Sequence, residues 1–87
     1  MLESIPRDIR PVSRVIVESD GWLVGVPLSP HAMRWWGNFT DWCTAFDSSF
    51  FHDYASKGPL IIFRSRRTSF RWLLHPATGE SLPDRIF

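Results

Sequence analysis

The sequence predicts an α+β fold, a small single domain in which an antiparallel sheet of two hairpins packs against one main helix and one short helix. Two pairs of apolar, β-branched or aromatic runs flank turn signals, and two further segments carry helix start and stop signals. The 87 residues include five Trp, one Tyr and seven Phe. Because each aromatic side chain can bury about 150 to 250 Å², we expect a dense core that needs neither disulfide nor metal.

The first hairpin is predicted over residues 13–18 and 22–28. A β-branched run in the first of these segments favours a pleated strand. Asp20 and Gly21 between two apolar runs are typical of a hairpin turn, since both tolerate a positive φ. Residues 1–13 contain two prolines and no sustained period, so we expect an extended lead-in, followed by one α+β domain over 14–87.

Two helices are predicted between the hairpins. Ser29 and Pro30 are a favourable N-cap and first residue for a short helix over 30–36, and Asp47 is a favourable N-cap for the main helix over 47–57. Between them, residues 41–46 form either a short strand or an irregular segment. The predicted apolar face of the main helix consists of Phe50, Phe51, Tyr54 and Ala55.

The second hairpin is predicted over residues 60–66 and 69–75. Residues 80–87 would return as a loop or a short edge strand, in which Ile86 and Phe87 can dock. The side chains expected to face the helices from the second hairpin are Leu60, Ile62, Phe63, Phe70, Trp72 and Leu74.

Charge is unevenly distributed along the chain. Residues 1–56 carry a net charge of −3 and residues 57–87 a net charge of +4, almost all of it from arginine. Trp and Arg are enriched at interface hot spots, so the arginines of the second hairpin and nearby tryptophans form either a partner-binding patch or simply a solvated hairpin end. The predicted partner-binding residues are Arg64, Arg66, Arg67, Arg71, Trp72 and Trp35.

Cys43 is the one candidate nucleophile. It could be activated by His52 or His75, with Asp47 or Asp53 orienting the imidazole. A free cysteine in an apolar segment is more commonly a small buried hydrophobe, and we expect Cys43 to be a core residue.

The three histidines stand 21 and 23 residues apart and there is no cysteine pair, so no metal site and no cofactor is predicted. A single cysteine and the lack of a secretory signal pattern favour a reducing bacterial cytoplasm. No apolar run approaches the roughly 20 residues of a membrane-spanning helix, so no membrane partner is expected.

Several short motifs occur together over about residues 39–84: Trp42-Cys43-Thr44-Ala45, Tyr54, Gly58-Pro59-Leu60-Ile61-Ile62, Leu74-His75-Pro76 and Thr78-Gly79-Glu80. Together these motifs resemble a recurrent module in bacteriophage and prophage proteins of unassigned function. The resemblance implies no catalytic residue. In size and general character the chain is also similar to anti-CRISPR inhibitors, which implies stoichiometric docking on a host defence complex.

These observations favour a small, non-enzymatic binding protein. Its predicted partner is a host protein or ribonucleoprotein complex with an acidic surface, which the basic hairpin would contact. One alternative is a nucleic-acid-binding module that uses the same arginines on phosphates and a tryptophan on bases. A second alternative is a small cysteine-dependent enzyme built on Cys43.

Overall fold

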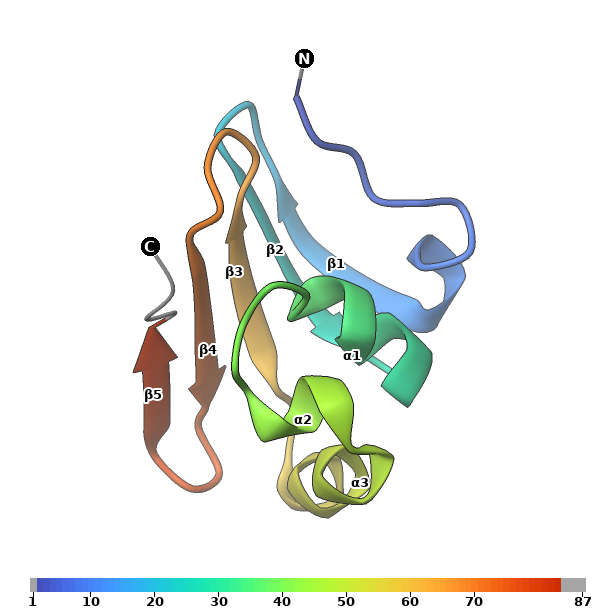
Figure 1. Cartoon of the computed structure of the whole chain (residues 1–87), viewed down its shortest axis with the longest axis vertical. Coiled ribbons are helices and arrows are strands. Elements are labelled where there is room, and N and C mark those ends of the chain that lie inside the picture. Colours follow the sequence, from blue (N-terminus) through green and yellow to red (C-terminus); the bar gives the residue numbers. More distant parts are fainter. Residues whose placement is uncertain (1, 84–87) are drawn as a thin grey trace.

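The computed structural model describes residues 2–83, which form a five-stranded antiparallel sheet and a layer of helices (Figure 1). The strand order β1-β2-β3-β4-β5 follows the chain. The α-helices come between β2 and β3 in the sequence, although these two strands are neighbours in the sheet. The predicted α+β class is confirmed, with one strand more than the two predicted hairpins. The strands are β1 (Ser13–Glu18), β2 (Trp22–Pro27), β3 (Ile61–Ser65), β4 (Arg71–His75) and β5 (Glu80–Pro83). The helices are the 3-10 helix η1 (Arg10–Val12), α1 (Pro30–Trp36), α2 (Cys43–Phe46) and α3 (Ser48–Lys57).

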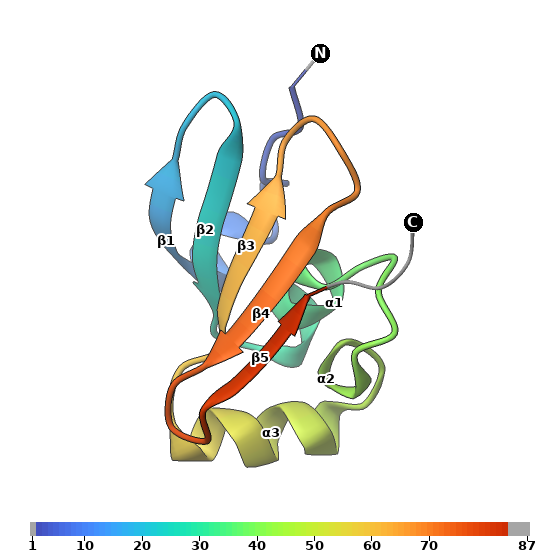
Figure 2. The same cartoon turned by 90° about the vertical axis from the view of Figure 1, so that its left-hand side faces the viewer.

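The helices cover one face of the sheet and leave the other open. Figure 2 shows the strands in front, α1 and α2 behind them, and α3 across the end of the sheet near the β4–β5 turn. The core lies between the two layers, where Leu23, Ile62 and Leu73 of the sheet meet Met33 and Trp36 of α1. None of the described helices is long and apolar enough to cross a membrane.

The first hairpin forms as predicted, and its Gly25 packs closely against α1. The pairing of β1 with β2 shifts at a bulge between Val15 and Val17. Gly25 faces the fully buried Trp36, and a Cβ atom at Gly25 would lie 2.6 Å from two carbons of the indole ring. The Trp36 indole nitrogen donates to the Ser13 hydroxyl at 2.8 Å. The indole is therefore held where only glycine fits opposite.

Both predicted helices form with their predicted caps. The Ser29 hydroxyl accepts a hydrogen bond from the Ala32 N–H at 3.1 Å, and the Asp47 carboxylate accepts one from the Ser49 N–H at 2.8 Å. The apolar face of α3 is narrower than predicted. Phe51 is its one buried residue, whereas Phe50 is exposed.

Residues 43–46 form the single-turn helix α2, so the expectation of a strand or irregular segment was wrong. The reason lies in which side chains must reach the core. Trp42 and Ala45 are both buried and stand three residues apart. A helical turn places such residues on one side, whereas a strand would point them to opposite faces.

The second hairpin forms where predicted, but its inward and outward faces are largely reversed. Leu60 and Ile62 are buried as expected. Arg64 pairs with Arg71 across the strands on the face toward the helices, and Leu73 and His75 lie on that same face. Successive residues of a strand point to opposite faces. The remaining four residues expected to face the helices therefore point to the open side: Phe63, Phe70, Trp72 and Leu74.

The N-terminal segment, expected as a lead-in outside the domain, packs against the helical layer and the sheet. Ile5 and Ile9 belong to the core cluster. The Glu3 N–H donates to the Arg66 carbonyl at 3.4 Å. At the other end, β5 is an edge strand paired with β4, while the predicted docking of Ile86 and Phe87 lies outside the described residues.

Candidate binding surface

The four hairpin arginines do not form one exposed cluster. Arg64 is 1 % exposed and Arg71 is 3 % exposed. Arg66 is half-buried, and Arg67 is exposed. The interpretation that the hairpin displays all four was therefore wrong for Arg64 and Arg71, because their strand positions face the helices.

Arg64 is the centre of a buried polar network. Its guanidinium donates to both carboxylate oxygens of Glu3, at 2.5 and 2.6 Å, and to the Asn38 side-chain oxygen at 2.7 Å. It also donates to the main-chain carbonyl of Trp35 and stacks 3.9 Å from the centre of that indole ring. Trp35, expected in a binding patch, is half-buried in this stack. These hydrogen bonds connect the N-terminal segment and the C-terminal end of α1 to β3.

Two other arginines donate to main-chain carbonyls. Arg66 donates to the Glu3 carbonyl at 2.8 Å and to the Ser19 carbonyl at 2.6 Å. Arg71 donates to the Thr68 carbonyl at 3.2 Å and to the Phe70 carbonyl at 3.0 Å. Three of the four predicted arginines therefore form hydrogen bonds within the fold, and the fourth, Arg67, is exposed to solvent.

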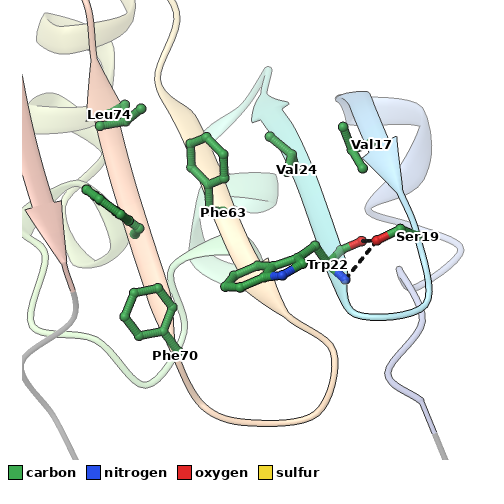
Figure 3. A pocket seen from close by; sticks show the side chains of 8 residues that line it. Val17, Ser19, Trp22, Val24, Phe63, Phe70 and Leu74 are labelled. Carbon is green, nitrogen blue, oxygen red and sulfur yellow. Dashed lines mark hydrogen bonds between the residues drawn. The ribbon is translucent and has the colours of Figure 1, made fainter.

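The open side of the sheet carries an apolar, aromatic surface. Trp22 and Trp72 are 41 % and 40 % exposed there. Side chains from β1 to β4 surround a shallow hollow of about 670 Å³, and Figure 3 shows Trp22, Phe63 and Phe70 lying close together along it. The hollow is lined by Val17, Ser19, Trp22, Val24, Phe63, Phe70, Trp72 and Leu74.

The aromatic side chains of this hollow hold one another in place. Phe70 meets Trp22 edge-to-face at 5.9 Å and Trp72 edge-to-face at 6.4 Å between ring centres. Phe63 lies 6.3 Å from Trp72. The Trp72 indole nitrogen donates to the Ser81 hydroxyl at 2.8 Å. Such contacts limit the side-chain freedom that would be lost on binding.

A second hollow of about 570 Å³ continues the same face toward the opposite ends of β1, β2 and β3. In β2 and β3 its residues have the same alternation phase as those of the first hollow, as Val26 does with Val24 and Ile61 with Phe63. In β1 the bulge between Val15 and Val17 shifts the phase, so that Arg14 and Ile16 share the open face with Val17. Together the two linings form what we call the apolar sheet face. The second hollow is lined by Arg14, Ile16, Val26, Leu28, Pro59 and Ile61.

Of the residues expected to bind a partner, Trp72 alone lies on the apolar sheet face. Trp22, Phe63 and Phe70 were missed. A signal for them was present, since β2, β3 and β4 all carry apolar residues in both phases of the two-residue period. Such a strand has an apolar side chain for each face, and only one face can be covered by the helical layer.

Cys43 is exposed, so its assignment to the core was wrong. It is the first residue of α2, and the two residues after it, Thr44 and Ala45, are the ones that this turn buries. Cys43 borders a small cavity of about 100 Å³, where the Tyr54 hydroxyl donates to Glu80 at 3.2 Å. The hydrogen bond to Glu80, with partial burial, raises the pKa of Tyr54.

The histidines considered as partners for Cys43 are placed differently. His75 is fully buried, and its ring nitrogens contact the Thr78 hydroxyl at 2.8 Å and the Tyr54 carbonyl at 2.9 Å. His52 is exposed on α3. Among residues 2–83 no hydrogen bond joins Cys43 to an imidazole, and no three metal-binding side chains gather into a site.

Cys43 should react with a thiol reagent such as Ellman's reagent in the native protein, because its side chain is accessible. We expect the full thiol equivalent to be titrated without denaturant, at a rate close to that of a small free thiol. A thiol that reacts only after unfolding would contradict the exposed position. Rapid labelling alone would not indicate a nucleophile, since exposure is sufficient for it.

Comparisons with protein-family models, with curated proteins and with solved structures found no match to this chain.

Proposed function

We propose that this protein is a non-enzymatic binding protein whose interface is the apolar sheet face. The observation that supports this proposal is a continuous apolar surface across β1 to β4, with two tryptophans about two-fifths exposed and one charged residue, Arg14, in its lining. Aromatic side chains are enriched in the buried centre of protein–protein interfaces. A surface of this kind is typical of a site for a partner protein.

The proposed interface consists of aromatic and aliphatic side chains from both hairpins in place of the arginines. Trp72 belongs to both versions. An acidic partner is less favoured than the sequence suggested, because Arg64, Arg66 and Arg71 are occupied within the fold. A partner with an apolar surface fits better. Docking on a host defence complex in the manner of an anti-CRISPR inhibitor stays a prediction from the resemblance.

A nucleic-acid-binding module is the second candidate. Aromatic side chains on an open sheet can stack on unpaired bases, and the exposed indoles of Trp22 and Trp72 favour this. Phosphate contacts need free cations, however, and the lining of the apolar sheet face supplies Arg14 only. Binding of single-stranded oligonucleotides that weakens steeply with salt would support this candidate over a protein partner.

Substitution of Trp72 by lysine tests the proposed interface. We expect Trp72→Lys to reduce capture of any partner at least about tenfold, because a charge would have to be buried in an apolar contact. Phe46→Lys is the matched control, since Phe46 is 70 % exposed on α2, on the helical side of the molecule. The amount of partner protein captured by each immobilised full-chain variant would be measured, together with the thermal unfolding of that variant.

Equal capture by the wild type and Trp72→Lys, with both folded, would contradict an interface on the apolar sheet face. Loss of capture in Phe46→Lys alone would place the interface on the helical side instead.

A further inference from the structure

We infer that the apolar sheet face binds a second copy of this chain, so that two sheets pack face to face in a homodimer. This inference rests on the proposed function and names its partner. Three properties of the described face support it: its charge, its area and its shape.

The charge of the face favours an apolar partner of the same kind. No carboxylate lies in the lining of either hollow, and the one cation, Arg14, lies at the end away from Trp22 and Phe70. A strongly basic partner would find no complementary charge in these linings, and a strongly acidic one would find only Arg14. An identical face brings the same apolar residues and no acidic group, so its association buries few charges.

The exposed side chains of the face can supply the area of a small specific dimer interface. A standard interface takes about 800 Å² from each partner, which is roughly 15 % of the 5211 Å² accessible surface of this chain. The four strands that carry the face, about 4.8 Å apart, span roughly 15 Å, and five of its apolar side chains are 40 % or more exposed: Ile16, Val17, Trp22, Leu28 and Trp72. Two indoles that are about 40 % exposed offer roughly 100 Å² each. One broad face can therefore supply an interface toward the small end of the specific range.

The shape of the face also suits a second copy. Twisted sheets pack on sheets of the same twist, with their strands about 30° apart, and a second copy has an identical twist. In a twofold dimer the same patch serves both partners. Each copy brings exposed indoles, Trp22 and Trp72, together with an apolar hollow. The face can thus offer both the side chains and the hollows that receive them.

Sedimentation equilibrium of the full chain tests the inference. Between roughly 5 and 500 µM, the range in which a small interface would associate, we expect the average mass to rise from 10.1 kDa toward twice that value. Trp22→Lys should weaken association at least about tenfold. The control Phe46→Lys should associate like the wild type. Val17→Lys, at another exposed position of the hollow, replaces Trp22→Lys if that variant does not fold.

The outcomes separate this inference from the proposed function. A wild type that stays monomeric over the whole range overturns the homodimer; capture of a different protein that is lost in Trp72→Lys would then leave the proposed function standing. A dimer that Trp22→Lys and Val17→Lys leave intact also overturns the inference, because association would use another surface. A dimer weakened by either face variant, and not by Phe46→Lys, supports it.

Discussion

Replacing Glu3 by alanine is expected to lower the free energy of unfolding by about 3 kcal/mol, a large share of the stability of a small domain. The substitution leaves the guanidinium of Arg64, 1 % exposed, without its carboxylate. Contacts with Asn38 and the Trp35 carbonyl remain, but they carry no net negative charge. Urea unfolding followed by tryptophan fluorescence would measure the loss.

The ion pair between Arg10 and Glu18 is the matched control. It is also bidentate, at 3.1 and 2.9 Å, but both side chains are substantially exposed. Exposed ion pairs contribute little to stability because solvent screens them, so Glu18→Ala should have a small effect. Similar losses in the two variants would mean that burial of Arg64 does not set the strength of its pair.

The ion pair between Glu3 and Arg64 should make the stability of the fold depend on pH. Partial burial acts to raise the pKa of Glu3, but the hydrogen bonds and charge of Arg64, with smaller contributions from Arg71 and Arg66, lower it below its ordinary value of 4.5. A lowered pKa in the folded state stabilises the fold above the ordinary value, and that contribution is lost as pH falls through the folded pKa. Unfolding measured from pH 6 down to about pH 3 should show a steeper loss for the wild type than for Glu3→Gln.

Replacing Gly25 by alanine is expected to cost about 3 kcal/mol, at the upper end of the usual range for overpacking. The new methyl group would lie 2.6 Å from two carbons of the Trp36 indole and 3.1 Å from the Arg14 carbonyl. The Trp36 indole is fully buried and donates a hydrogen bond to the Ser13 hydroxyl, so it cannot move aside freely. Thermal and urea unfolding of the variant would measure the cost.

Gly21→Ala is the control for Gly25→Ala, because a Cβ atom there meets nothing within 4 Å. We expect it to change stability by less than about 0.5 kcal/mol. In a Trp36→Phe background, which removes part of the clashing ring, Gly25→Ala should cost less than in the wild type. An equal cost in both backgrounds would show that the clash with Trp36 is not the cause.

Much of the fold follows from local sequence signals. The first hairpin turns at Asp20 and Gly21 as expected, although neither residue has the positive φ on which that prediction was based, and the Ser29 and Asp47 side chains cap the helices that they were expected to begin. These features depend on neighbouring residues, so they can be recognised without knowledge of the rest of the chain. Residues 43–46 were harder, because a four-residue helix has too little length to show a period and forms here through the packing of Trp42 and Ala45.

The candidate site was predicted less well, since its position depends on which face of each strand is covered. A shift of one residue in the phase of a strand exchanges its two faces. Arg64 was assigned to the surface because an arginine is rarely buried without a partner. Its partner Glu3 lies 61 residues away in the sequence, and no local pattern connects the two.

The α+β class, the two hairpins, the two capped helices and the aromatic richness of the chain can be recognised in the amino-acid sequence, since they depend on local or compositional properties. That Arg64 and Arg71 face the helices while Phe63 and Trp72 face outward depends instead on contacts between distant parts of the chain. Burial of a charge is tolerated where distant groups neutralise it. Once Glu3 and Trp35 hold Arg64 inside, alternation along the strand places the aromatic side chains on the open face.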